Sequence, residues 1–510
     1  MNSVIDLRYY QQTAYITAYL RTYLTVLFKL FNRYTLIPLA LTVLTVSTQS
    51  ANIKLPSLGD STSAIVSPQK EHELGRAWLM AYRGRIHESN DTLLLDYLER
   101  LISKLSLHSQ LQDHRLEVIA IDNSSMNAFA VPGGVLGVHT GLFNYAESED
   151  QLSSVLSHEI AHLSQRHFAR RLETQKRNST ATMAGMLGAL VLAVTVGGDA
   201  AMAAMTGAMA ASQGSTLRYS RQSEQEADRI GIQTMAEAGM DPHGMSAMFE
   251  QILKNTRYTG SKPPEFLLTH PLTENRVADA RNRASQYPPK QYQDNIEYHL
   301  MRIRAIITID KNPSVSLNRF QHELDGNSLN REAAQYGLAL TQSAKGHYSA
   351  ARLSLNRLLE KSPDRLTYLL ADIKMDRAEK KFGLAISKTK KILKVHPSSY
   401  PLQMSLAETY LKANRFYESE LVLKDLAQRR QNTPLVWYQL AEVRGLAGNI
   451  SGVHKARAQY FMLNGAFDQA RDQFSYARKL LIHDYKQTAI IDQQLRDVAI
   501  QEKKMQELFK

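Results

Sequence analysis

The chain has 510 residues, of which 44% are hydrophobic and none is cysteine, and its formal net charge is +12. A chain of this length can bury more than one core, so we expect at least two domains. The lack of cysteine excludes disulfide scaffolds, thiolate metal sites and a cysteine nucleophile, so any metal must bind to histidine and carboxylate side chains. The basic residues are dispersed without a nucleic-acid recognition motif, so we expect a solvated basic surface and no nucleic-acid partner.

Residues 1–50 are interpreted as a signal segment for export, and residues 51–70, which contain Pro, Ser and Gly, as a linker. Lys29 and Arg33 precede the apolar run 36–46 (LIPLALTVLTV), which is short for a transmembrane helix and is followed by small residues. The tyrosine-rich lead-in is unusually long. It leaves two alternatives: translation starts further downstream, or this part is an amphipathic anchor.

A small sheet is predicted after two helical patterns over residues 71–86 and 91–109. Residues 116–121 resemble a strand, and residues 127–131 and 135–139 predict a hairpin around Pro132-Gly133-Gly134. Pro132 lacks an N–H group, so we expect the pairing strand to end at the preceding residue. An edge strand here can pair with an extended peptide, and the alternative is a purely structural hairpin.

The central motif of the chain is Ser157-His158-Glu159-Ile160-Ala161-His162. Residues four apart share one face of a helix, so His158 and His162 can direct their imidazoles at one metal ion. Glu159 lies next to this pair, where it can hold a metal-bound water without binding the metal itself. Zinc lowers the pKa of such a water toward about 7, and a carboxylate can then take its proton during attack on a peptide carbonyl. The alternative is a surface helix that carries two histidines.

The local context supports a helix at this motif. Ser148 and Gln151 are spaced as a capping box, and no Pro or Gly interrupts the helical pattern from there to about Arg177. Two further histidines, His139 and His167, lie near the motifs but outside the ligand spacing, so we expect them to be hydrogen-bonded structural residues.

A catalytic zinc needs three protein ligands and one open position. Glu224 and Asp228 are four apart on a predicted helix that ends before Gly239, so they share a face. We assign Glu224 to the metal and Asp228 to the ring N–H of a ligating histidine, whose tautomer it would fix. Glu226 faces another side of this helix and is expected in solvent.

The Ala-, Met- and Gly-rich segment 181–214 lies between the two metal-binding regions. Its longest uncharged part is barely long enough to span a bilayer, and Gly197-Gly198-Asp199 interrupts it. We interpret it as a helical hairpin that forms a core element or a lid, in preference to a membrane-touching flap or a span.

Four motifs carry a family resemblance: NAFAVPGG at 127–134, HEIAH at 158–162, EQEAD at 224–228 and His270-Pro271. Together they resemble the HtpX/Ste-type gluzincin peptidases, and within them the periplasmic branch of β-barrel assembly-enhancing proteases, which carry C-terminal tetratricopeptide repeats. The resemblance implies one zinc ion per chain on His158, His162 and Glu224, with Glu159 as the general base. It also implies a substrate-binding edge strand at Asn127, Ala128, Phe129 and Ala130.

The same resemblance draws attention to His270 and Arg276 in the segment HPLTENR. His270 can bind zinc in a resting state, which would block the open position until its loop moves, or it can stabilise a tetrahedral intermediate. The alternative for His270 is a loop residue packed beside Pro271. Arg276 is expected either to orient the carboxylates or to bind substrate.

From about residue 333 the sequence repeats with a period of 34, in which Leu338, Leu406 and Leu440 fall in register. This period and a helix–turn–helix pattern are the tetratricopeptide signature, and we expect four to five helical pairs. The aromatic residues of the repeats are predicted to form inter-repeat core: Tyr368, Tyr400, Tyr417, Trp437 and Tyr438.

The predicted protein is mainly α. It has a zincin-like α+β metallopeptidase domain with a small sheet over residues 71–290, connecting helices over 291–332 and an α-solenoid of tetratricopeptide repeats over 333–510. The predicted function is a periplasmic zinc endopeptidase that degrades misassembled outer-membrane proteins and assists their assembly. The resemblance implies two kinds of partner, unfolded or misassembled outer-membrane proteins and the outer-membrane assembly machinery, and peripheral membrane contact is a further expectation. The alternative is a chaperone or adaptor whose repeat array binds partners and whose protease is largely silent.

Overall fold

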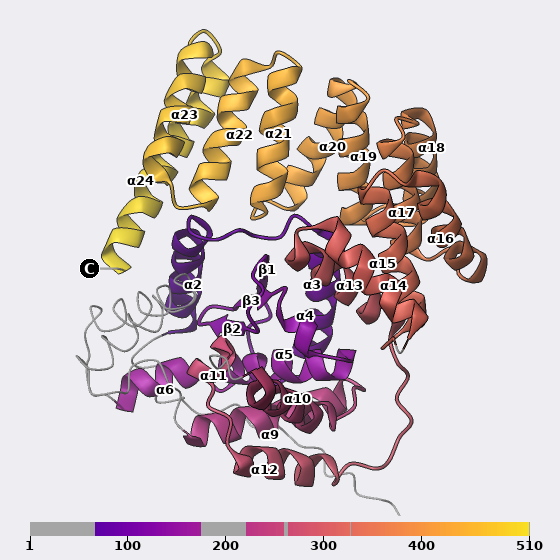
Figure 1. Cartoon of the computed structure of the whole chain (residues 1–510). Coiled ribbons are helices and arrows are strands. Elements are labelled where there is room, and N and C mark those ends of the chain that lie inside the picture. Colours follow the sequence, from indigo (N-terminus) through magenta and orange to yellow (C-terminus); the bar gives the residue numbers. More distant parts are fainter. Residues whose placement is uncertain (1–66, 175–220, 260–263, 327, 509–510) are drawn as a thin grey trace, which may run out of the picture. The chain divides into compact units, whose positions relative to one another are not determined.

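The computed structural model describes residues 67–174, 221–259, 264–326 and 328–508, and all of them belong to one compact unit, Gly59–Lys510. The predicted signal segment and the predicted hairpin at 181–214 lie outside these ranges. Within the described ranges, no helix is both long and apolar enough to cross a bilayer. The described chain is mainly helical and has one small sheet (Figure 1).

The sheet has three strands in the order β1-β3-β2, namely β1 (Glu117–Ile121), β2 (Ala128–Val131) and β3 (Val135–His139). β2 and β3 form the predicted antiparallel hairpin, whereas β1 runs parallel to β3. β2 ends before Pro132, as predicted, and begins one residue later than predicted. Because β2 pairs only with β3, it is an edge strand of this sheet.

Helices cover both faces of the sheet. One face packs against α2 (Pro68–Arg83), and the other packs against α3 (Thr92–Leu107) and α5 (Glu149–Ser164). Because side chains alternate along a strand, Phe129 points toward α2, whereas Ala128 and Ala130 point toward α3 and α5. A Cβ atom at Gly137, opposite Phe129 on β3, would lie 2.1 Å from the Phe129 ring, so only glycine leaves room for that ring.

The helix of the central motif begins as predicted but is shorter. The Ser148 hydroxyl accepts the Gln151 N–H, as in the predicted capping box, whereas the Gln151 side chain accepts the N–H of Glu147, one residue before the cap. The prediction of one helix to about residue 177 is wrong, because α5 ends at Ser164 and a second helix, α6 (His167–Thr174), follows. Between them Arg166 has a φ of 50°, a left-handed conformation through which a right-handed helix cannot continue.

Five more helices complete the region around the sheet: α4 (Leu142–Tyr145), α9 (Arg221–Glu237), α10 (Gly244–Thr259), α11 (Glu265–Thr269) and α12 (Glu274–Ala284). α9 packs along α5, and a Cβ atom at Gly231 would lie only 3.2 Å from the backbone nitrogen of His158. This close approach brings the acidic first half of α9 beside the histidines of α5. Gly239, with a φ of 74°, follows the end of α9 as predicted.

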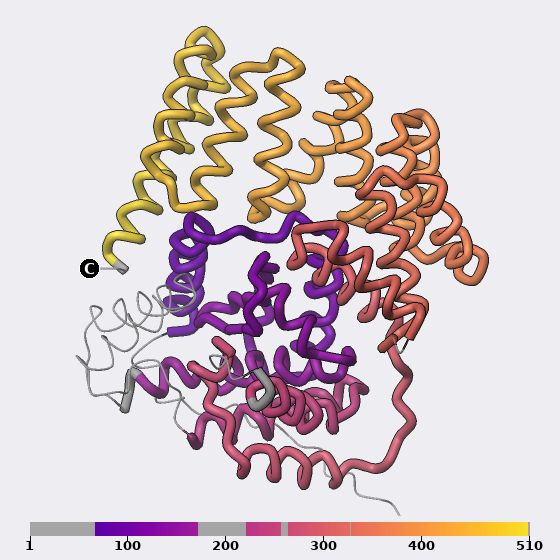
Figure 2. Tube along the Cα trace, in the orientation of Figure 1, coloured from indigo at the N-terminus to yellow at the C-terminus, as the bar shows by residue number. Residues whose placement is uncertain are grey.

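The repeat region consists of consecutive helical pairs with the predicted period, which Figure 2 traces in chain order. The pairs are α15 (Arg331–Ala344) with α16 (Tyr348–Lys361), α17 (Leu366–Ala378) with α18 (Phe382–Leu393), α19 (Tyr400–Lys412) with α20 (Phe416–Arg429), α21 (Pro434–Leu446) with α22 (Ile450–Leu463), and α23 (Phe467–Leu480) with α24 (Tyr485–Leu508). Two helices precede them, α13 (Ile296–Asp310) and α14 (Pro313–Asp325), and α14 packs on α15.

The aromatic residues of the repeats divide into two groups. Tyr368 and Tyr400 are buried, as predicted, whereas Tyr417 and Tyr438 are 70% and 56% exposed, so the prediction of a core position is wrong for these two. The Tyr438 ring also packs against the Tyr460 ring on α22, with the ring centres 5.7 Å apart. Tyr417 and Tyr438 remain available for contact with other molecules.

The repeats contact the region around the sheet directly. Arg430, after α20, donates to both carboxylate oxygens of Glu99 on α3 at 2.9 and 2.7 Å, and its guanidinium lies 4.1 Å from the centre of the Tyr400 ring. α2 also contacts α22 and α24. The repeat helices are therefore attached to the sheet region at several places.

Candidate active site

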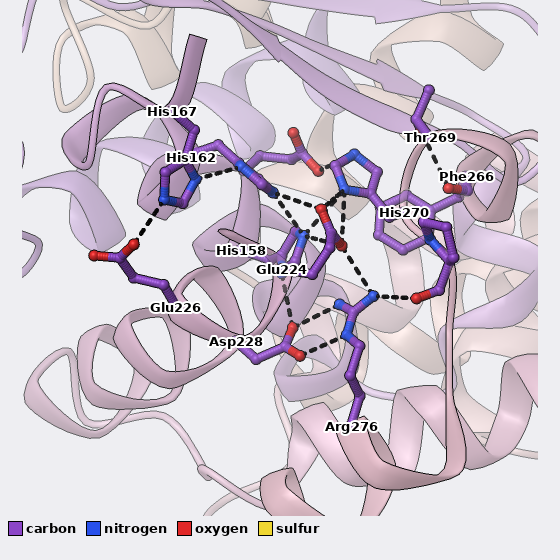
Figure 3. A network of polar contacts seen from close by, with 12 residues as sticks. His158, His162, His167, Glu224, Glu226, Asp228, Phe266, Thr269, His270 and Arg276 are labelled. Carbon is purple, nitrogen blue, oxygen red and sulfur yellow. Dashed lines mark hydrogen bonds and ion pairs between the residues drawn. The ribbon is translucent and has the colours of Figure 1, made fainter. Parts of the chain in front are cut away.

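The predicted site residues come together from four separate elements (Figure 3). α5 carries His158, Glu159 and His162, and the first half of α9 carries Glu224 and Asp228. His270 directly follows α11, and Arg276 lies in the first turns of α12. All seven side chains are buried.

Four of these residues direct one ligand atom each toward a common point: His158, His162, Glu224 and His270. The Nε2 atoms of His158 and His162 are 3.0 Å apart, and His270 Nδ1 is 3.2 Å from His158 Nε2. The Glu224 carboxylate lies 3.1 Å from His270 Nδ1 and 3.5 Å from His162 Nε2. The ligand atoms of all four residues lie within 4.8 Å of one another, which is compact enough to surround one ion.

The protonation pattern of this cluster fits a divalent cation. Asp228 accepts a hydrogen bond from His158 Nδ1 at 2.9 Å, so the proton of the neutral ring is on Nδ1 and Nε2 carries a lone pair. That lone pair faces the Nε2 atom of His162, 3.0 Å away, and the Glu224 carboxylate, 3.6 Å away, so three possible electron-pair donors lie around one point. Imidazole nitrogen and carboxylate oxygen are ordinary zinc donors.

The electrostatics of the cluster keep its carboxylate charged. Burial alone would raise the pKa of Glu224, but the neighbouring His270, His162 and His158 rings hold it well below its usual value. Burial lowers the pKa of His162 well below its usual value, so this ring is neutral. An ionised carboxylate and a neutral imidazole are the forms in which these side chains bind a metal.

Glu159 lies beside the four clustered residues but is not one of them, and it also faces the backbone of β2. Burial raises the pKa of its carboxyl group, and the Ala130 N–H of β2 donates a hydrogen bond to it. Its Oε1 atom has no hydrogen-bond partner within the described part of the chain, although His270 Nε2 lies 3.4 Å away. The carboxyl group therefore lies between the ligand cluster and the edge strand.

The edge strand β2 presents two residues toward this site. The Asn127 carbonyl accepts the His139 N–H. Hydrogen-bonded pairs alternate along an antiparallel ladder, so Phe129 and Val131 face β3 with their backbone groups, whereas those of Ala128 and Ala130 point outward. The hydrogen bond from Ala130 to Glu159 confirms this direction. An extended peptide paired to β2 would therefore pass next to Glu159.

Arg276 is buried between the two carboxylates of α9. Its Nε and Nη2 atoms donate to Asp228 at 2.7 Å each, and Nη1 lies 2.9 Å from Glu224 and donates to the Pro271 carbonyl at 2.8 Å. Of the two predicted roles, this geometry favours orientation of the carboxylates over contact with substrate. The bond to Pro271 also ties α12 to the loop that carries His270.

Glu226 faces away from the four clustered residues, as predicted, and its side chain is 37% exposed, but it is also paired with two neighbouring side chains. Its carboxylate lies 3.2 Å from His167 Nε2 and accepts from Arg170 Nη1 at 2.8 Å. His167 is itself buried, and its Nδ1 atom lies 2.7 Å from Nδ1 of His162. The sequence gives no signal for this contact, because five residues along a continuous helix place two side chains on different faces.

His139, at the end of β3, is a buried structural histidine, as predicted. The Ser125 hydroxyl lies 2.8 Å from its Nδ1 atom and donates to Glu265 at 3.0 Å. Burial lowers the pKa of His139 to about 4, against 6.5 for an ordinary histidine. The folded protein therefore holds this ring neutral throughout the range from about pH 6.5 to pH 4.

We expect His139 to make the protein less stable in mild acid. Below about pH 6.5 the unfolded chain binds a proton at this ring and the folded chain does not, so the free energy of unfolding falls by about 3 kcal/mol between pH 6.5 and pH 4. Urea unfolding at several pH values should show that His139→Gln removes this part of the acid sensitivity. Equal pH profiles for His139→Gln and wild type would contradict the assignment.

Comparison with known proteins places these residues in a recognised context. The model of peptidase family M48 matches residues 93–284. The chain is 35% identical over 426 residues to the beta-barrel assembly-enhancing protease of Escherichia coli O157:H7, which covers 83% of this chain and 86% of that protein. It is 32% identical over 437 residues to a putative beta-barrel assembly-enhancing protease of Vibrio cholerae, covering 85% and 90% of the two chains. It is also 28% identical over 203 residues to the mitochondrial metalloendopeptidase OMA1 of Schizosaccharomyces pombe, covering 39% and 57%.

Proposed function

Because the chain belongs to peptidase family M48 and, within it, to the beta-barrel assembly-enhancing proteases, we propose that it cleaves misassembled outer-membrane proteins in the periplasm with one zinc ion. It is a metalloendopeptidase. The observation that carries the proposal is the convergence of His158, His162 and Glu224 on one point, with Glu159 between that point and an edge strand.

In this proposal His158, His162 and Glu224 hold the zinc. A zinc ion bound there supplies Lewis-acid chemistry, which polarises a peptide carbonyl and lowers the pKa of water to about 7. Asp228 holds the ring of His158 in the ligating tautomer through the bond at 2.9 Å, and Arg276 fixes both Asp228 and Glu224. These two residues position the ligands without contacting substrate.

The substrate would bind as an added strand. In this proposal an extended chain pairs with the outward-facing backbone groups of Ala128 and Ala130 on β2. β2 is buried in the described structure and the Ala130 N–H faces Glu159, so the opening that frees the metal position must also expose this edge. Because backbone groups provide the hydrogen bonds, the substrate sequence is largely unrestricted. This pairing places a peptide bond beside Glu159, which takes a proton from the attacking water and transfers it to the leaving amine. A folded protein cannot offer such a strand, so the site selects unfolded or misassembled chains.

The test of this function compares one outer-membrane protein in two states. The purified full chain should cut the urea-diluted, unfolded form into fragments and leave the detergent-folded form intact, and a zinc chelator should stop the cleavage. Fragments are measured by gel electrophoresis and mass spectrometry. Equal cleavage of both forms, or cleavage that chelator does not affect, would contradict the proposal.

We propose that His270 blocks this arrangement and keeps the enzyme in a resting state. Its ring lies within the ligand cluster, in contact with His158, Glu224 and Glu159. A fourth protein ligand occupies the position that a reacting carbonyl or water needs. Cleavage therefore requires that the loop after α11 first moves away.

We expect His270→Ala to cleave an unfolded substrate faster than wild type. The gain is about tenfold for each 1.4 kcal/mol by which the His270 contact favours the closed state. Initial rates with a fluorogenic unfolded substrate measure it. The matched control is His299→Ala, which removes another buried histidine, paired with Asp294, and should not raise the rate. A slower His270→Ala enzyme would instead support the role in stabilising a tetrahedral intermediate.

A second function, binding of chains without cleavage, is favoured by a cavity beside the repeats. The cavity has a volume of about 650 Å³ and lies between α3, β1 and the α19–α20 pair. Its lining includes hydroxyl and amide side chains that suit a polypeptide backbone, such as Ser103, Gln403, Gln428 and Asn432. In this proposal the repeats recruit client proteins or the outer-membrane assembly machinery, and the peptidase acts only on chains that fail to assemble.

A further inference from the structure

We propose that His167 and Glu226 extend the metal centre as positioning residues, in which Glu226 orients His167 and His167 holds the His162 ring with its Nε2 atom facing the metal. The inference rests on the proposed role of His162 as a metal ligand. Neither residue belongs to the four that surround the metal position, and the spacing of the motifs does not identify either of them.

The geometry forms one continuous line of polar contacts, visible on the left of Figure 3. His167 Nδ1 lies 2.7 Å from His162 Nδ1, and His167 Nε2 lies 3.2 Å from a carboxylate oxygen of Glu226. Arg170, one turn further along α6, donates to both carboxylate oxygens at 2.8 and 3.3 Å. The His162 and His167 rings are buried, whereas the outer end of the line, at Glu226 and Arg170, reaches the surface.

The contact between the two rings fixes the position of their protons. Two Nδ1 atoms at 2.7 Å require one donor and one acceptor. The Nε2 atom of His162 must be unprotonated to bind a metal, so the proton of this neutral ring is on Nδ1 and is donated to His167. The proton of the His167 ring is then on Nε2, from which it is donated to Glu226.

This line of contacts completes a pattern that already exists on the other ligating histidine. The His158 ring is held directly by Asp228, whereas the His162 ring is held by Glu226 through His167. The carboxylates of Glu226 and Asp228 both come from α9, two positions apart. Asp228 accepts a hydrogen bond from the His158 ring directly, and Glu226 accepts one from the His167 ring that holds His162. A carboxylate that accepts the outer N–H of a metal-bound histidine fixes its tautomer and makes the ring a stronger ligand.

The bend at Arg166 is what makes the second contact possible. Five residues along an uninterrupted helix correspond to a rotation that would leave His162 and His167 about 140° apart around the axis. The left-handed conformation of Arg166, with a φ of 50°, ends α5 and redirects the chain. The His167 side chain thereby returns to the buried face of α5, beside His162.

The inference is tested by zinc affinity, measured for the purified full chain in competition with a chromophoric chelator. His167→Phe removes both hydrogen bonds, and we expect its zinc dissociation constant to rise about 10- to 100-fold. His167→Asn keeps an acceptor oxygen near the position of Nδ1, so its affinity should lie between that of His167→Phe and wild type. Glu226→Gln should weaken binding less than His167→Phe, and the exposed Glu237→Gln on the same helix serves as the matched control.

Two further readouts separate positioning from packing. The melting temperature of each zinc-free variant reports folding, and the visible spectrum of the cobalt-substituted protein reports the geometry of the ligands. We expect His167→Phe to change the cobalt spectrum and His167→Asn to restore it in part. The inference would be overturned, without affecting the proposed function, if His167→Phe bound zinc as tightly as wild type. It would also be overturned if His167→Asn bound zinc no more tightly than His167→Phe. A wild-type chain without zinc affinity would overturn the proposed function, and this inference with it.

Discussion

Replacement of Glu159 by Gln is expected to lower the turnover of an unfolded substrate by about 10²- to 10⁴-fold, the range over which general bases act. Gln has the shape of Glu but cannot take a proton, and in the structure Glu159 is outside the group of four residues that surround the metal position. The variant should therefore keep its zinc. Turnover is measured by fragment release and zinc content by atomic emission.

The matched control for this prediction is Glu147→Gln, which alters an exposed glutamate just before α5 and should leave turnover unchanged. Retained zinc with lost cleavage would support Glu159 as the base. If Glu159→Gln cleaved at the wild-type rate, the assignment would be wrong. If it lost cleavage but still supported outer-membrane assembly fully in cells, the binding function of the repeats would be the more important one.

Replacement of Arg276 by Met is expected to destabilise the zinc-free protein by about 3–5 kcal/mol at neutral pH, because it leaves buried charges without their partner. Arg276 is 4% exposed and is within 2.9 Å of both the Asp228 and the Glu224 carboxylates. Burial favours the neutral forms of these groups, and hydrogen bonds with Arg276 help to keep the pKa of Asp228 below its usual value. Urea unfolding with chelator present measures the loss.

Arg281→Met on the same helix is the matched control for Arg276→Met. Arg281 pairs with Glu250 at the surface, where the two side chains are 62% and 51% exposed, and such pairs contribute at most about 1 kcal/mol. Zinc should recover part of the stability of Arg276→Met, because a cation again neutralises Glu224. If the two replacements lowered the free energy of unfolding equally, Arg276 would not be needed to neutralise the buried carboxylates.

The parts of the fold that were predictable from sequence are those in which spacing translates directly into geometry. Residues four apart share one face of any regular helix. This alone brings His158 beside His162, and Glu224 beside Asp228. The hairpin around Pro132 follows from turn residues between two apolar runs, and the repeats follow from their period. In each case neighbours in sequence determine the contact.

The parts that were not predictable depend on tertiary contacts. No local pattern indicated that α5 would end at Ser164, because the residues from Gln165 onward are ordinary helix formers and the interruption is a single backbone angle at Arg166. Without that bend, His167 and Glu226 could not be connected to His162. The sequence also does not decide the role of Arg276, because the choice between orienting the carboxylates and binding substrate depends on its burial.

One divergent repeat position has a similar explanation. Asp372 on α17 stands where the repeat pattern favours an apolar residue, and the structure pairs it with Arg352 on α16 and Lys388 on α18. Asp376, one turn later and 1% exposed, pairs with the same two cations. Ion pairs between two aspartates and two basic residues, on three neighbouring helices, replace the apolar contact of the other repeats. The repeat pattern in the sequence does not reveal these pairs.

The central claim is that two histidines of α5 and one glutamate of α9 bind a catalytic zinc ion. Its most direct test is the anomalous difference density at the zinc absorption edge, in crystals of the full chain purified without chelator. The account predicts one peak per chain, in contact with His158, His162 and Glu224. No peak, or a peak away from these three side chains, would contradict it.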